Sequence, residues 1–150
     1  SFLLPVGIVG SAIATAGLAV LIWCLPAFLV GVPRWVAAMV GAALAFTLAL
    51  TWFDATAIVG IASTTTDPVF DDIGSSAGVS APFVPKSVLG LVAFAALAIS
   101  GHRAGTLGRA GAALIGLGAV VYLLPPYPPG LVLVSIGLLV AARRGGQGSH

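Results

Sequence analysis

The carboxylate of Asp54 is the first group in this sequence that could take part in chemistry. It follows an apolar stretch that runs from Trp35 through Phe53, and a helix continuing past it would carry Asp54 to bilayer depth. A carboxylate is costly there, so it would be a candidate proton or cation site for coupled transport. If the helix ends at Phe53, Asp54 lies at the outer interface beside Trp52. The sequence accommodates both registers.

Three threonines, Thr47, Thr51 and Thr56, flank Asp54 and add hydroxyl groups to the same stretch. Threonine hydroxyls in membrane helices commonly donate to a backbone carbonyl of their own helix. We therefore expect these side chains to bond back to the helix that carries them, and they do not decide between the two registers of Asp54.

Three further aspartates, Asp67, Asp71 and Asp72, form an acidic cluster in a polar segment. Carboxylates suit a hard cation such as calcium, but the spacing does not follow a calcium-binding loop. We interpret the cluster as part of a solvated loop and predict no metal site.

The remaining polar residues do not form a catalytic or cofactor-binding set. His102 stands next to Arg103 in an expected turn and His150 is the last residue, so a haem between two imidazoles would lack its ligands. Ser75 and Ser76 lie in a glycine-rich and serine-rich loop, on a side of the membrane where no histidine falls. We predict no catalytic residue and no cofactor.

Small residues recur every fourth position at Gly108, Ala112 and Gly116, and again at Gly10 and Ala14. Such spacing lets helix backbones approach closely, and close packing drives helix association in lipid. The first three residues are therefore a candidate helix-packing face. That face could pack within the chain or against another subunit.

The composition excludes an ordinary water-soluble domain. Of the 150 residues, 59% are hydrophobic and 7% are charged, whereas soluble domains are about 25% charged. The formal net charge of +2 comes from basic residues scattered at segment ends, which does not indicate a nucleic-acid partner. The sequence predicts an all-α integral membrane protein whose main partners are lipids, located in the plasma membrane.

Proline, arginine and the polar segment divide the chain into five expected transmembrane helices within a single domain of residues 1–150. A span needs about 20 apolar residues. No charged side chain occurs before Arg34, and no basic residue precedes the first apolar run, so we expect a retained first helix and not a cleaved signal peptide. The expected helices are about 2–25, 35–62, 85–100, 105–124 and 128–142, with an outer polar loop at 63–84.

Basic residues predict the orientation. Arg34 lies between the first and second helices, Arg103 and Arg109 lie between the third and fourth, and Arg143 and Arg144 follow the fifth. In a five-helix arrangement these places share one side, and basic short loops mark the cytoplasmic side. We therefore predict an N-terminus outside and a C-terminus in the cytoplasm.

The last apolar run leaves an alternative open. Its second leg, 128–142, would span only about 22 Å at 1.5 Å per residue, which is short for a crossing. Three transmembrane helices followed by a re-entrant, proline-rich hairpin would also satisfy the sequence, provided that other helices cover its backbone.

No motif identifies a reaction, so enzymatic activity is not expected. The leading interpretation is a small polytopic membrane protein without catalytic activity, acting as a helical subunit or scaffold in a homo-oligomer or with other membrane subunits. The alternative is a small transporter or channel for protons, cations or a small solute that uses Asp54.

Overall fold

The part of the chain described by the computed structural model is helical. It comprises residues 3–53, 56–57, 59–64, 66, 68–69, 72, 81–124 and 128–147, and no strand occurs among them. Asp54, Asp67 and Asp71 lie outside the described residues, as does His150. The expectation of an all-α chain is confirmed for the described part.

Six helices are described: α1 (Leu3–Phe28), α2 (Arg34–Phe53), α3 (Val59–Thr64), α6 (Phe83–Arg103), α7 (Arg109–Tyr122) and α8 (Pro128–Gln147). Two differ most from the expected ranges. Of the helix expected over 35–62, the structure describes α2 up to Phe53 and the short helix α3, while residues 54, 55 and 58 lie outside the described part. The last helix runs five residues beyond 142 and includes Arg143.

The first helix passes through Pro26 without ending there. Proline lacks the N–H that would bond to the carbonyl four residues earlier, so it removes a helical hydrogen bond. Here the missing hydrogen bond lies in the last turn, because α1 ends at Phe28. The Leu29 amide then donates to the Pro26 carbonyl oxygen at 3.3 Å. The helix expected to end near residue 25 therefore continues three residues further, with Pro26 in its last turn.

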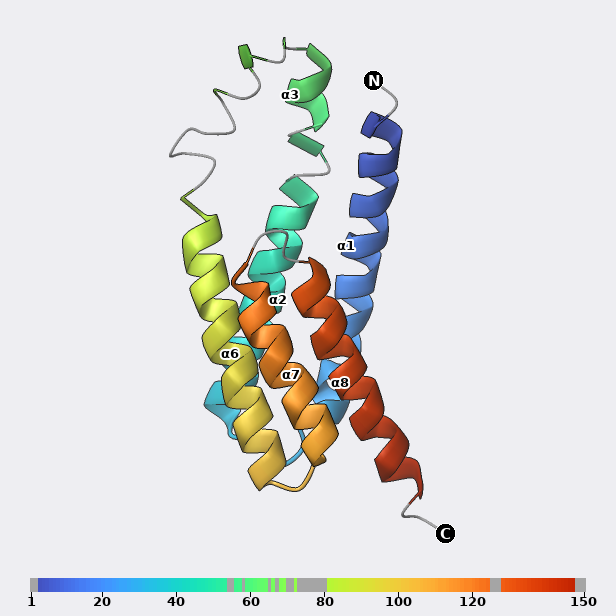
Figure 1. Ribbon diagram of the computed structural model, residues 1–150, viewed down its shortest axis with the longest axis vertical. Helices are drawn as coiled ribbons and strands as arrows, with labels where there is room; N and C mark the ends of the chain where they lie inside the picture. The colour runs from blue at the N-terminus through green and yellow to red at the C-terminus, as the bar shows by residue number, and fades with distance from the viewer. Residues whose placement is uncertain are drawn as a thin grey trace.

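Consecutive long helices run in opposite directions (Figure 1). Each packs on the next along the chain, in the order α1, α2, α6, α7 and α8, and α8 returns to contact α1. The α1–α2 turn meets the α6–α7 turn, because a Cβ atom placed on Gly31 would lie 3.7 Å from Ala104 Cβ. The chain's two ends lie at opposite ends of the bundle (Figure 1).

The tightest packing joins α7 to α8 through glycines. A Cβ atom placed on Gly118 would lie 2.8 Å from the Gly130 carbonyl oxygen, and one on Gly111 would lie 3.0 Å from the Gly137 carbonyl oxygen. Side chains would push these backbones apart. The two helices therefore form a close hairpin of the kind that small residues permit in lipid.

Two described helices, Arg34–Phe53 and Phe83–Arg103, are long and apolar enough to cross a membrane. Shorter apolar stretches occur at Ala12–Trp23, Arg109–Val121 and Pro129–Arg143. Large apolar side chains such as Ile13, Trp23 and Leu139 are exposed on the outside of the bundle. These features support association with a membrane.

Candidate functional site

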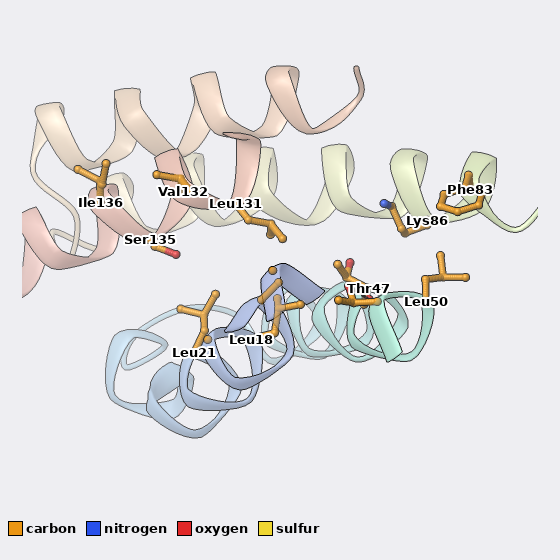
Figure 2. A pocket seen from close by; sticks show the side chains of 14 residues that line it. Leu18, Leu21, Thr47, Leu50, Phe83, Lys86, Leu131, Val132, Ser135 and Ile136 are labelled. Atoms are coloured by element: carbon orange, nitrogen blue, oxygen red, sulfur yellow. Dashed lines mark hydrogen bonds between the residues drawn. The ribbon is translucent and has the colours of Figure 1, made fainter. Parts of the chain in front are cut away.

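A cavity of about 480 Å³ lies between α1, α2, α6 and α8. Figure 2 shows side chains from all four helices facing this space. Its wall is largely apolar, with one lysine and three hydroxyl residues: Gly10, Ala14, Gly17, Leu18, Leu21, Thr47, Leu50, Thr51, Phe83, Lys86, Leu131, Val132, Ser135 and Ile136. The cavity is therefore an apolar space with a single described cationic group on its wall.

Lys86 provides that cationic group from the first turn of α6. The residue is only 2% exposed. Its Nζ lies 5.0 Å from the centroid of the Tyr122 ring and 5.5 Å from that of Phe83. Ring faces attract a cation, and more strongly where water is excluded, so the two aromatic residues stabilise the ammonium group at this buried position.

Contacts with two other helices fix the position of the Tyr122 ring next to Lys86. Its hydroxyl forms a hydrogen bond with Thr47 Oγ1 on α2. Thr47 donates its only hydroxyl hydrogen to the Ala43 carbonyl oxygen at 2.7 Å, so Tyr122 is the donor in the bond between the two hydroxyls. The Tyr122 ring also meets Phe94 of α6 edge-on, with centroids 5.6 Å apart. These contacts fix the ring.

Gly90 makes room for that ring on α6. A Cβ atom placed on Gly90 would collide with ring atoms of Tyr122. The ring therefore lies directly against the α6 backbone, one turn from Lys86. This close approach explains why the lysine can lie over the ring while both residues stay buried.

Thr47, Gly90 and Tyr122 lie at one depth in the bundle. Each is thirteen residues along its helix from an arginine at the same end of the bundle: Arg34, Arg103 and Arg109, respectively. At 1.5 Å per residue, this layer is about 20 Å from the arginine end. The Lys86 backbone lies one further turn away, at about 25 Å.

The three threonines near Asp54 in the sequence behave as predicted. In addition to the Thr47 bond, Thr51 donates to the Thr47 carbonyl oxygen at 2.9 Å and Thr56 donates to the Trp52 carbonyl oxygen at 2.8 Å. These hydroxyl hydrogens are used within the chain. Thr47 and Thr51 can therefore offer the cavity only acceptor oxygens, and Lys86 is the described lining residue with charged N–H donors.

Of the other predicted residues, Gly10 and Ala14 line this cavity, whereas Asp72 and His102 do not. Asp54 lies outside the described residues, so its proposed role stays a prediction. Asp72 is exposed. His102 lies in the last turn of α6, where its Nδ1 is 3.2 Å from the Leu107 carbonyl oxygen. Among the described residues, no three His, Cys, Asp or Glu side chains lie together in a way that could hold a metal ion.

The predicted packing face of Gly108, Ala112 and Gly116 differs from the closest contacts that α7 makes. Gly108 precedes the first turn of α7, and Ala112 packs against the core. A Cβ atom placed on Gly116 would meet no atom within 4 Å. The close approach uses Gly111 and Gly118 instead, so the role of the predicted face in binding another subunit stays a prediction.

Sequence analysis did not identify Lys86 or Tyr122 as site residues. A usable signal was present in α7, where Gly111, Ile115, Gly118 and Tyr122 are all buried. Their alternating spacing of four and three residues is typical of a helix face in a bundle, and a tyrosine on such a face needs a polar partner for its hydroxyl.

Comparison with models of protein families, with curated protein sequences and with solved structures gave no match for this chain.

Proposed function

We propose that this chain is a multi-pass protein of the plasma membrane with five crossings, its N-terminus outside and its C-terminus in the cytoplasm. The alternating directions of α1, α2, α6, α7 and α8 support this arrangement (Figure 1). So do the lengths of α2 and α6, which suit a hydrocarbon layer of about 30 Å.

The distribution of arginine supports the orientation. Arg34 begins α2, Arg103 ends α6 and Arg109 begins α7, next to the two turns that meet at Gly31. Arg143 lies near the C-terminal end of α8, which is at the same end of the bundle (Figure 1). Basic residues near short loops favour the cytoplasmic side.

Within the membrane, we propose that the protein acts without catalysis as a binding subunit of an oligomer. The observation that carries this proposal is the wall of the cavity, where one buried lysine and three hydroxyl residues interrupt an apolar surface. Few polar groups in an apolar wall are typical of a site that orients a ligand. The Thr47 and Thr51 hydroxyls donate their hydrogens to backbone carbonyl oxygens of α2.

The oligomer part of the proposal is tested at Gly116. A Cβ atom placed on Gly116 meets no atom within 4 Å, which leaves room for a helix from another subunit to pack against this residue. Native mass spectrometry of the purified chain in mild detergent should show an oligomer, and Gly116→Leu should shift it towards monomer. Gly41→Leu is the matched control, because a Cβ atom placed on Gly41 of α2 also meets nothing within 4 Å. A wild-type chain that is entirely monomeric would contradict this part.

Transport is the second candidate function, and the cavity between four helices is the observation that favours it. In this case Asp54 would bind the proton or cation. Proteoliposome flux should then depend on pH, and Asp54→Asn should remove that dependence, while Asp72→Asn at an exposed position should keep it. Flux whose pH dependence survives Asp54→Asn would exclude the coupling role.

A further inference from the structure

We infer that the cavity beside Lys86 binds a membrane lipid with an anionic phosphate headgroup, with the phosphate at Lys86 and an acyl chain between α1 and α8. This inference rests on the proposed location of the chain in a membrane and names the ligand class of the same cavity.

The shape of the wall suits a chain-like apolar group. The lining residues of α1 extend from Gly10 to Leu21, about 16 Å along the helix at 1.5 Å per residue. Across from them, Leu131, Val132 and Ile136 line the cavity from α8 (Figure 2). The volume of about 480 Å³ lies within the range of about 300 to 1,000 Å³ typical of small-molecule sites.

The charge of the wall suits an anion. Lys86 is the only charged residue among the described lining residues. An ammonium group has three N–H donors, so it can donate to a ligand in addition to its contacts within the chain. Hydrogen bonds from an ammonium group to a phosphate are among the stronger ones that proteins make. The hydrogens of Thr47 and Thr51 are bonded within α2, so Lys86 is the charged donor that the described wall offers to a headgroup.

The depth of Lys86 suits a lipid of the outer leaflet. Its backbone lies about 25 Å from the arginine end, close to the far boundary of a hydrocarbon layer about 30 Å thick. From there the cavity extends towards the arginine end along Leu18 and Leu21 of α1 and along Ser135 and Ile136 of α8. A lipid with its phosphate at Lys86 would therefore place its acyl chain in the direction of the bilayer centre.

Lipid binding to the full chain in mild detergent tests this inference by native mass spectrometry. The probes are phosphatidylglycerol and phosphatidylcholine with identical acyl chains, each titrated separately. We expect phosphatidylglycerol to bind more tightly. Lys86→Met should weaken its binding about tenfold, the order expected for a lost charged hydrogen bond. Arg143→Gln, which removes one exposed positive charge outside the cavity, should leave the affinity within about twofold.

A second variant keeps the test decisive if Lys86→Met does not fold. A Cβ atom placed on Gly17 meets no atom within 4 Å although this glycine lines the cavity, so Gly17→Leu directs a side chain into the cavity from a position with room for its Cβ. It should abolish phosphatidylglycerol binding, whereas Gly41→Leu, outside the cavity, should not. Soluble glycerol phosphate at the same concentration should not compete, since it lacks the acyl chain.

Three results would overturn the inference. Equal binding of the two lipids would show that Lys86 does not select an anion. Undiminished binding by Gly17→Leu would place the lipid outside the cavity. A copurifying protein that is displaced by Gly17→Leu, with no lipid bound, would make a partner helix the occupant. None of these outcomes depends on the number of membrane crossings. A failure of the lipid-binding inference can therefore be distinguished from an error in the proposed topology.

Discussion

The ring of Tyr122 occupies the space that a side chain on Gly90 would need. This contact joins α7 to α6 one helical turn along α6 from Lys86. The hydrogen bond from the Tyr122 hydroxyl to Thr47 joins the same side chain to α2. One aromatic residue therefore links three helices at a single depth and forms the surface over which the lysine lies.

Gly90→Ala should destabilise the protein. Tyr122 is fully buried and held by Thr47 and Phe94, so its ring cannot move aside for a methyl group without losing those contacts. Overpacking of this kind costs about 1 to 3 kcal/mol. Thermal unfolding in detergent measures the change. Gly41→Ala is the control and should be neutral or slightly stabilising, because its Cβ enters open space and alanine favours a helix.

Tyr122→Phe and Thr47→Val should be strongly coupled. The first removes the hydroxyl that donates to Thr47, and the second removes the acceptor. Each alone should lower the free energy of unfolding by about 1 kcal/mol. The loss in the double variant should be smaller than the sum of the two single losses. The difference, which is the coupling energy, should be about 0.6 kcal/mol, the average for such bonds in membranes. Strictly additive losses in a double-mutant cycle would show that the bond contributes nothing.

Gly130→Ala should cost more than Gly116→Ala although both glycines belong to the α7–α8 hairpin. A Cβ atom on Gly130 would lie 2.5 Å from the Tyr122 backbone nitrogen, whereas one on Gly116 meets nothing within 4 Å. Backbone cannot yield as a flexible side chain can, so we expect a loss of about 2 to 3 kcal/mol at Gly130 and none at Gly116. Denaturant titration of both variants measures the difference. Equal effects would mean that the two helices do not pack through their glycines.

Gly105→Ala should weaken the turn between α6 and α7 through backbone strain alone. Gly105 has a φ of 75°, and no atom lies within 4 Å of a Cβ placed on it. The left-handed conformation costs a non-glycine residue about 1 to 2 kcal/mol. Gly105→Asn should cost less, since asparagine tolerates this region better. If the unfolding midpoints of the two variants coincide with wild type, the turn is not held in this conformation.

Much of the helical order was predictable because strong local signals mark the ends of the elements. Arg34, Arg103 and Arg109 stand where α2 begins, where α6 ends and where α7 begins. The prolines before Pro128 separate α7 from α8, since consecutive prolines cannot continue a helix. The extent of the second helix was less certain from sequence, because the apolar stretch continues beyond Phe53 and Asp54 fits two registers.

The site was not predictable in the same way, because it depends on which helix faces meet. The sequence offers a four-residue spacing of small residues at Gly108, Ala112 and Gly116. In the structure, α7 instead faces α8 with Gly111 and Gly118. Ile115 and Tyr122 are buried on that same face and set the rotation of the helix. Lys86 illustrates the same point. A lysine near the start of a helix is ordinarily solvated, whereas here the rings of Phe83 on the same helix and of Tyr122 on α7 lie beside the buried ammonium group.

Compartment-specific labelling of single cysteines tests the proposed membrane arrangement most directly. The background is Cys24→Ser, which removes the chain's only cysteine. Single cysteines are then introduced by Ser1→Cys, Thr106→Cys, Leu124→Cys or Gln147→Cys. Each variant is treated with a membrane-impermeant maleimide in intact and in permeabilised cells. Five crossings predict labelling from outside at positions 1 and 124, and labelling only after permeabilisation at 106 and 147. Protection of position 124 in both conditions would replace the last two crossings by a re-entrant hairpin. Labelling of positions 1 and 147 from the same side would contradict the arrangement altogether.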